Sequence, residues 1–240
     1  TVTVVVEAVK TDGETAPAVA PARMFLPGEA PGTPGLRTSM PLARLIPQGA
    51  CDELTLLTGG ACTVTVTAEA GDTATAESYR VSEAGLHLFR FDTRDFPGAE
   101  RVTVDAGECG AVNYSVIPAV RDGVRLAWRS SAGSIEHYTF PVVRTMTVRA
   151  ERREAEGPEG RVVAASSAGR ETLLASAYEG QAVLEALACL TAAPEVWIAE
   201  GDVYTPVCVV TDEAVVRRHG TLCCLEIAIR PKCKSRVSWN

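Results

Sequence analysis

Histidines and paired carboxylates are the side chains of this sequence whose types could support acid–base or metal chemistry. The histidines His87, His137 and His219 lie far apart in the chain, and none belongs to a His-Glu-x-x-His pair. Asp92 and Asp95 are close enough in sequence to act as a general acid and base, as glycoside hydrolysis requires. Aspartate at such a spacing more often caps a turn through bonds to its own backbone. We therefore expect turn and strand positions for these five residues.

Motifs for nucleophilic catalysis and phosphate binding are also missing. The sequence has no Gly-x-Ser-x-Gly elbow, and Gly59-Gly60 is followed by a strand pattern without the helix N-terminus that would hold a phosphate. Trp128, Trp197 and Trp239 could stack on sugar rings, but the first two alternate with apolar residues, which is typical of core positions. The sequence therefore predicts no catalytic, cofactor-binding or metal-binding residues.

The eight cysteines could form disulfides, bind a metal or lie buried as small apolar side chains. No Cys-x-x-Cys motif occurs, and the spacings are not those of a zinc ribbon. We expect mostly reduced, structural cysteines, with one or more disulfides or a metal site as alternatives. Cys51 and Cys62 bracket a plausible hairpin, so they are the first pair to test for a disulfide. The full set is Cys51, Cys62, Cys109, Cys189, Cys208, Cys223, Cys224 and Cys233.

Charge and hydropathy exclude several function classes. The formal net charge is −7 and the pI is about 5.1, which argues against sequence-independent nucleic-acid binding and against an anionic membrane surface. No run of about 18 apolar residues exists, so we expect no membrane insertion. The opening TVTVVVEAV alternates like a strand and lacks the basic region of a signal peptide, which fits a trimmed or mature form. With 46% hydrophobic residues the chain can bury a substantial core.

The strongest structural pattern is a β-hairpin over residues 124–140. Val124, Leu126 and Trp128 alternate with Arg125 and Arg129, as in a strand with one apolar face. A polar Ser-Ser-Ala-Gly-Ser turn then leads into a second alternating strand. Further short strands are separated by turn residues at intervals typical of a sandwich or barrel. We expect them at 1–9, 54–57, 62–68, 74–81, 85–91, 101–105, 111–118, 141–149, 196–199, 203–210 and 222–229.

Three segments depart from this β pattern. Seven prolines between Pro17 and Pro47 predict an irregular, proline-rich arm over about 15–47. The charged run at 151–161, ERREAEGPEGR, favours the tip of a hairpin on an extended ribbon, with a helical turn or a linker as alternatives. One α-helix is expected near 177–191, because Ser176 and Glu179 have the spacing of a capping box before a helical repeat of apolar residues.

The predicted fold is therefore mainly β, an antiparallel β-sandwich or barrel architecture in two β-rich domains with one helix. Residues 1–118 would form an N-terminal β-sandwich carrying the proline-rich arm. Residues 119–240 would form a C-terminal β-rich domain that contains the helix.

Two segments carry a resemblance to a known family. The first is LAWRSSAGSIEHYTF at 126–140, and the second is ETLLAS at 171–176 with the helix, PEVWI at 194–198 and YTPVCVV at 204–210. Their order resembles tail- or baseplate-associated structural proteins of tailed phages and prophages of Bacteroides-type gut bacteria. Those proteins share a Leu-x-Trp-x-Asn-x-x-Gly-x-x-Asp-x-Tyr-x-Phe hairpin, in which Ser130 and Glu136 of this chain replace the asparagine and the aspartate.

The resemblance implies a structural protein that self-associates and binds other structural proteins, located in the virion or in the cytoplasm of the producing bacterium. Residues 15–47 and 150–160 would then carry the contacts between subunits. A cell-surface or secreted β-sandwich adhesin or glycan-binding module is the alternative. A carboxylate-based hydrolase is a third reading of the sequence.

Overall fold

The fold is mainly β, as the sequence predicts. The computed structural model describes residues 5–9, 15–19, 33–158, 160–216, 223–232 and 235–237. Its sheets are open and pair antiparallel except where β4 meets β10, and its one α-helix is short. Apart from the hairpin of β1 (Val5–Val9) and β2 (Thr15–Val19), the strands gather around two separate hydrophobic cores.

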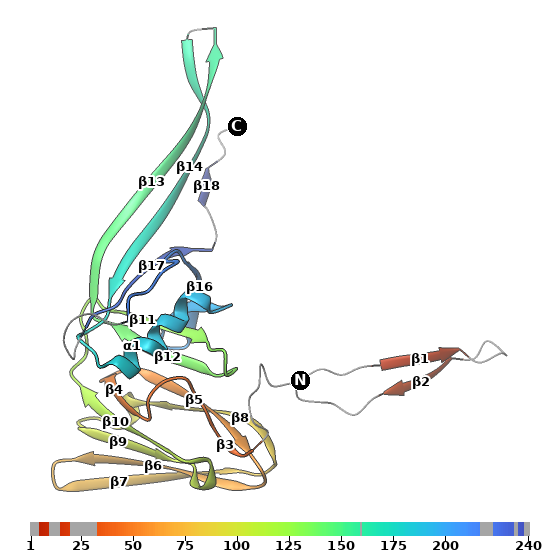
Figure 1. Ribbon diagram of the computed structural model, residues 1–240, viewed down its shortest axis with the longest axis vertical. Helices are drawn as coiled ribbons and strands as arrows, with labels where there is room; N and C mark the ends of the chain where they lie inside the picture. Colours follow the sequence, from red (N-terminus) through yellow and green to blue (C-terminus); the bar gives the residue numbers. More distant parts are fainter. Residues whose placement is uncertain are drawn as a thin grey trace.

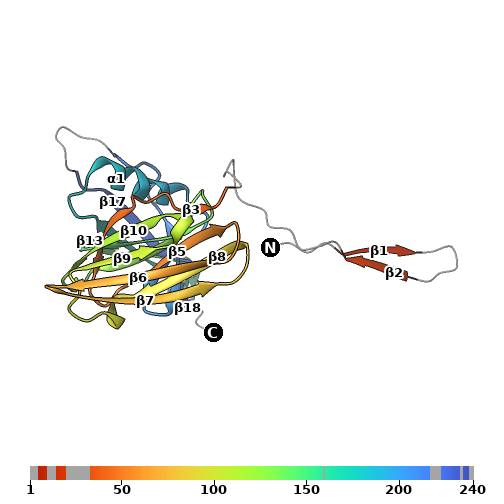
Figure 2. The same ribbon diagram turned by 90° about the horizontal axis from the view of Figure 1, so that it is seen from below.

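The first core lies between two stacked sheets (Figure 2). Alternation explains the packing, because Val64, Val66 and Ala68 of one strand are buried while the residues between them are not. One sheet has the order β4 (Ala43–Pro47), β10 (Ala111–Ile117), β9 (Arg101–Asp105), β6 (Cys62–Ala70) and β7 (Thr73–Val81). The other has the order β3 (Gly35–Arg37), β5 (Cys51–Thr58) and β8 (Gly85–Asp92). Short 3₁₀ turns at Thr93–Asp95 and Gly107–Cys109 connect these strands.

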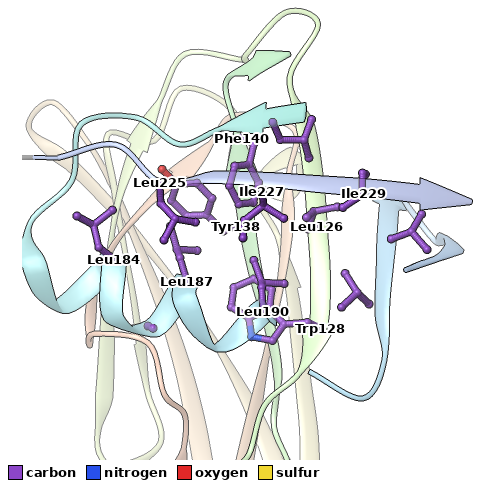
Figure 3. Packing of buried hydrophobic residues seen from close by; sticks show 14 of the residues in the cluster. Leu126, Trp128, Tyr138, Phe140, Leu184, Leu187, Leu190, Leu225, Ile227 and Ile229 are labelled. Carbon is purple, nitrogen blue, oxygen red and sulfur yellow. The ribbon is translucent and has the colours of Figure 1, made fainter. Parts of the chain in front are cut away.

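The second core lies between one large sheet and a helix. The sheet runs β12 (Ile135–Phe140), β11 (Val124–Arg129), β15 (Val196–Glu200), β16 (Val203–Val209), β17 (Glu226–Pro231), β14 (Gly160–Ala175) and β13 (Val142–Gly157). Leu184, Leu187 and Leu190, from α1 (Gln181–Ala188) and the following 3₁₀ turn (Cys189–Ala192), pack on the sheet (Figure 3). Trp128 and Phe140 of the predicted hairpin are fully buried beneath them.

The predicted hairpin is confirmed in detail. Arg129 pairs with Ile135 at the end of the ladder, and the Ser130 amide donates to the Ser134 carbonyl at 2.9 Å. Gly133 has a φ of 82°, a left-handed conformation that favours glycine at this turn.

The interpretation of the charged run as a ribbon tip is also confirmed. β13 and β14 are each 16 residues long and turn between Gly157 and Gly160. At about 3.3 Å per residue they reach about 50 Å. β14 pairs with β17 only over Thr172–Ala175, so most of the ribbon projects from the sheet, on the side away from β6 and β7 (Figure 1). Farther out, β18 (Ser235–Val237) adds a third strand at Ser166–Ala168.

Two local predictions are wrong. The arm was expected to reach residue 47, but β3 and β4 belong to the first sandwich, where Ile46 is fully buried; residues 20–32 lie outside the described residues.

The helix begins at Gln181 after an N-cap at Gly180 that makes no side-chain bond. The predicted capping box does not form because its two side chains bond elsewhere: Ser176 accepts from the Leu225 amide and Glu179 accepts from a tyrosine.

Candidate functional site

Buried charges fill the contact between the two cores. We call these charged residues, together with the buried and uncharged Tyr114, the joint cluster: Arg44 on β4, Asp52 on β5, Tyr114 on β10, Arg125 on β11 and Glu136 on β12. Arg44 Nη1 lies 3.5 Å from Asp52 Oδ2 and 3.6 Å from Glu136 Oε2. The three side chains are 4%, 3% and 1% exposed, so these charges are held almost without water. The arginine also donates to the Pro41 carbonyl at 2.8 Å.

Glu136 is surrounded by donors from both halves of the chain. Its carboxylate accepts from the Ser39 amide at 2.9 Å, the Thr38 hydroxyl at 2.9 Å and the Ser134 hydroxyl at 2.6 Å. Burial nevertheless raises its pKa above the ordinary carboxyl value, although Arg44 and these donors act in the opposite direction. Because Thr38 and Ser39 precede β4 while Glu136 belongs to β12, this side chain ties the first sandwich to the large sheet.

A second buried pair lies beside the cluster. His137 Nε2 is 3.0 Å from Glu53 Oε2, and the imidazole is fully buried. Burial alone would raise the pKa of Glu53, but its hydrogen bond and charge interaction with His137 hold that pKa below the ordinary value of 4.5. Glu53 and Asp52 are consecutive on β5, which is buried on both faces because one packs on the first core and the other on β12.

The shifted pKa of Glu53 predicts a pH dependence of stability. A carboxyl whose pKa is lowered by folding stabilises the native state above its unfolded pKa, and this contribution disappears as the pH falls through the folded value. We expect Glu53→Gln to lower the free energy of unfolding by about 1 kcal/mol at pH 7 and to lose less stability than the wild type on acidification below about pH 4.5. Urea unfolding between pH 3 and pH 7 measures this difference. Parallel curves for the two proteins would contradict it.

Two arginines extend these contacts toward solvent. Arg125 donates to the Cys51 carbonyl at 2.6 Å and to the Thr139 hydroxyl at 2.9 Å, joining β5 to the predicted hairpin. Arg90 on β8 pairs at 2.6 Å with Asp202, which lies in the turn between β15 and β16. Arg125 also lies 3.8 Å from Asp52, so both arginines link the first sandwich to the large sheet.

A pocket of about 180 Å³ opens next to the joint cluster. Its lining includes Arg44, His137 and Tyr138, and the tyrosine hydroxyl donates to Glu179 Oε1 at 2.8 Å. Among the residues that the structure describes, no group of three or more His, Cys, Asp or Glu side chains is placed to hold a metal ion.

The structure places the residues singled out in the sequence as follows. Asp92 accepts from the Arg94 amide at 2.8 Å, which confirms its role in a turn, and Trp128 lies in the second core. Trp197 is half-buried, and His87 bonds the Glu83 carbonyl at 2.9 Å. Two further candidates, His219 and Trp239, lie outside the described residues.

Glu136 and His137 are the residues that sequence reasoning missed. They were interpreted as ordinary strand positions because no partner is visible near them in the sequence. Their partners Arg44 and Glu53 are more than 80 residues away along the chain. The available signal was weak: Glu136 and His137 are adjacent and so lie on opposite faces of β12, and both are buried.

Seven cysteines are described, and all of them are free. Cys51 and Cys62 do not form the disulfide considered above. Cys51 begins β5 and Cys62 follows its end, so an eight-residue extended strand separates them. This distance is far beyond the Cα separation that a disulfide allows.

Two long strands at sheet edges offer backbone groups to a partner. β7 and β13 each end their sheet, and nearly every side chain on both is exposed. Exposed apolar side chains also gather on the ribbon, where Met146, Val148, Val162 and Val163 are each at least half exposed. Another chain can add a strand to such an edge through backbone hydrogen bonds, and the exposed apolar side chains can pack against it.

The chain was compared with models of known protein families and with curated proteins. Neither a scan against models of known protein families nor a search of curated proteins finds a match to this chain. Among the described helices, none is both long and apolar enough to cross a membrane.

Proposed function

We propose that this chain is a non-enzymatic structural protein that works by self-association, as a tail-associated component of a phage or prophage. The observation that carries the proposal is the β13–β14 ribbon. It extends far from the sheet and leaves apolar side chains exposed along its length.

The ribbon adds little to the stability of the chain that carries it. The described residues between 144 and 171 contribute no side chain to either hydrophobic core. A two-stranded ribbon is marginal in water, because it buries little surface against the entropy of ordering its backbone. A ribbon of this length is therefore best explained by contacts with another molecule, which would bury Met146 and Val148.

The joint cluster supports the same function. An assembly subunit must hold its parts in one orientation, and buried ion pairs between the two cores make a change of angle costly. The phage resemblance of the hairpin at 126–140 favours a tail location and other structural proteins as partners. The glycan-binding alternative is less favoured, because Trp128 is buried and the exposed Tyr79 and Tyr178 lie on different elements.

Sedimentation velocity of the intact chain over a hundredfold range of concentration tests self-association. We expect the mean mass to rise above the 25.3 kDa of one chain toward a discrete multiple of it. A mass of one chain at every concentration would overturn the proposed function.

A further inference from the structure

The geometry points to a specific contact between two copies of this chain, and this inference rests on the self-association proposed above. We propose that the free edges of β13 in two copies pair with each other. The strands would be antiparallel, related by a two-fold axis at Ala150, so that Arg149 of each copy lies opposite Glu151 of the other. The two ribbons would then form one continuous sheet.

The edge of β13 is available for this pairing. β13 is the last strand of the large sheet, and β14 pairs with one of its edges along the whole length. The opposite edge of β13 has no partner strand among the described residues. The strand contains no proline, and its own extra residue is Arg144, near the base, between Val143 and Thr145. A second irregularity of the ribbon, between Arg153 and Glu154, is an extra residue on β14, so the backbone of β13 continues past it. From Thr145 to Gly157 it therefore presents an uninterrupted row of backbone donors and acceptors, the feature that natural edge strands usually avoid.

Symmetry restricts the registers that two such edges can adopt. In an antiparallel pair, opposite residues lie on the same face of the sheet and share the same hydrogen-bonding type. For two identical regular strands, the two-fold axis must then pass through a residue and not between two residues. Each possible register is thus defined by the residue on the axis.

Charge selects among these registers. An axis at Arg149, Glu151, Arg152 or Arg153 places two like charges directly opposite each other. An axis at Ala150 places a small side chain there and sets Arg149 against Glu151 twice, once on each side of the axis. Farther along, Val148 faces Arg152 and Met146 faces Glu154, so no like charges meet within the regular stretch that begins at Thr145. Opposite charges across a strand pair stabilise it, and like charges destabilise it.

Arg149 and Glu151 have no partner within their own ribbon. Across β14, Arg149 faces Gly169 and Glu151 faces Ser167, neither of which carries a charge. By contrast, Arg144 pairs with Glu226 at 3.0 Å and Glu154 with Arg161 at 3.7 Å. Charges on an edge strand often serve to prevent pairing. Arg152, Arg153 and Glu156 likewise have no ion pair among the described residues, but in this register only Arg149 and Glu151 of these five lie directly opposite each other.

Charge reversals on the ribbon test this contact without touching either core. Arg149→Glu and Glu151→Arg each turn two attractive pairs into two repulsive ones, so we expect each variant to associate about 10-fold more weakly or worse. The double variant R149E/E151R restores opposite charges and should associate within about 3-fold of the wild type. Arg153→Glu is the matched control, because Arg153 faces the uncharged Thr147 in this register, and its association should stay within about 3-fold of the wild type.

Mixing the two single variants gives the sharpest outcome. In a mixed pair, each glutamate of R149E faces an arginine of E151R, so an equimolar mixture should associate although neither variant alone does so at the same concentration. Sedimentation velocity measures all of these samples. If the wild type associates but the single variants associate equally well, or the mixture stays dissociated, the β13 pairing is wrong and self-association stands. If the wild type is monomeric throughout, both proposals fall.

Discussion

Replacing Arg44 by methionine is expected to lower the free energy of unfolding by about 3–5 kcal/mol. Methionine fills much of the same space, but it leaves Glu136 without a cation and Asp52 with only Arg125, at 3.8 Å. Both carboxylates are almost fully buried, so water cannot replace the lost charge. Breaking a buried ion pair by removing one partner carries this large cost because an uncompensated charge remains behind. Urea unfolding followed by far-ultraviolet circular dichroism measures the change.

The matched control for this prediction is Arg129→Met. Arg129 pairs with Glu195 at 2.9 Å, but both side chains are nearly half exposed. Solvent screens such a pair, so its loss should cost less than about 1 kcal/mol. If Arg44→Met and Arg129→Met destabilise the protein equally, the joint cluster does not hold the two cores together as described.

Shortening the ribbon is expected to abolish self-association while leaving both cores intact. The variant joins Arg149 to Gly169, which already face each other, through an Asn-Gly turn that replaces residues 150–168. The described side chains that are removed lie outside both cores, and the backbone contact that is lost with another element is the short pairing of β18 with Ser166–Ala168. The free energy of unfolding should therefore change by no more than about 1 kcal/mol. Urea unfolding checks that the variant folds, and sedimentation velocity checks its association. A large loss of stability would show instead that the ribbon supports the fold.

Local patterns in the sequence predicted much of this fold. The hairpin at 124–140 could be predicted because its alternation and its glycine turn act over neighbouring residues only. The strands β5 to β10 of the first sandwich could be predicted for the same reason, whereas β3 and β4 could not. The tip of the ribbon was predicted, because Gly157 and Gly160 indicate a turn there. β14 was not predicted, because Ser166-Ser167-Ala168-Gly169 in its middle has the residue types of the turn at 130–133, whereas pairing with β13 keeps this segment extended.

Features that depend on distant partners were not predictable. Ser176 and Glu179 have the spacing of a capping box, but Ser176 accepts a hydrogen bond from the Leu225 amide and Glu179 accepts one from the Tyr138 hydroxyl. The proline-rich composition before residue 47 hid β3 and β4, whose apolar residues are fixed by burial in the sandwich. The joint cluster was missed because its members come from five strands. A single sequence shows nothing of the pairing between them.

Self-association through the ribbon is tested most directly by comparing the intact and shortened chains side by side in sedimentation velocity at matched concentrations. We expect the intact chain to reach a discrete multiple of 25.3 kDa, and the shortened chain to remain at the mass of one subunit even at the highest concentration. Equal association of the two chains would contradict the assignment of the ribbon as the contact surface.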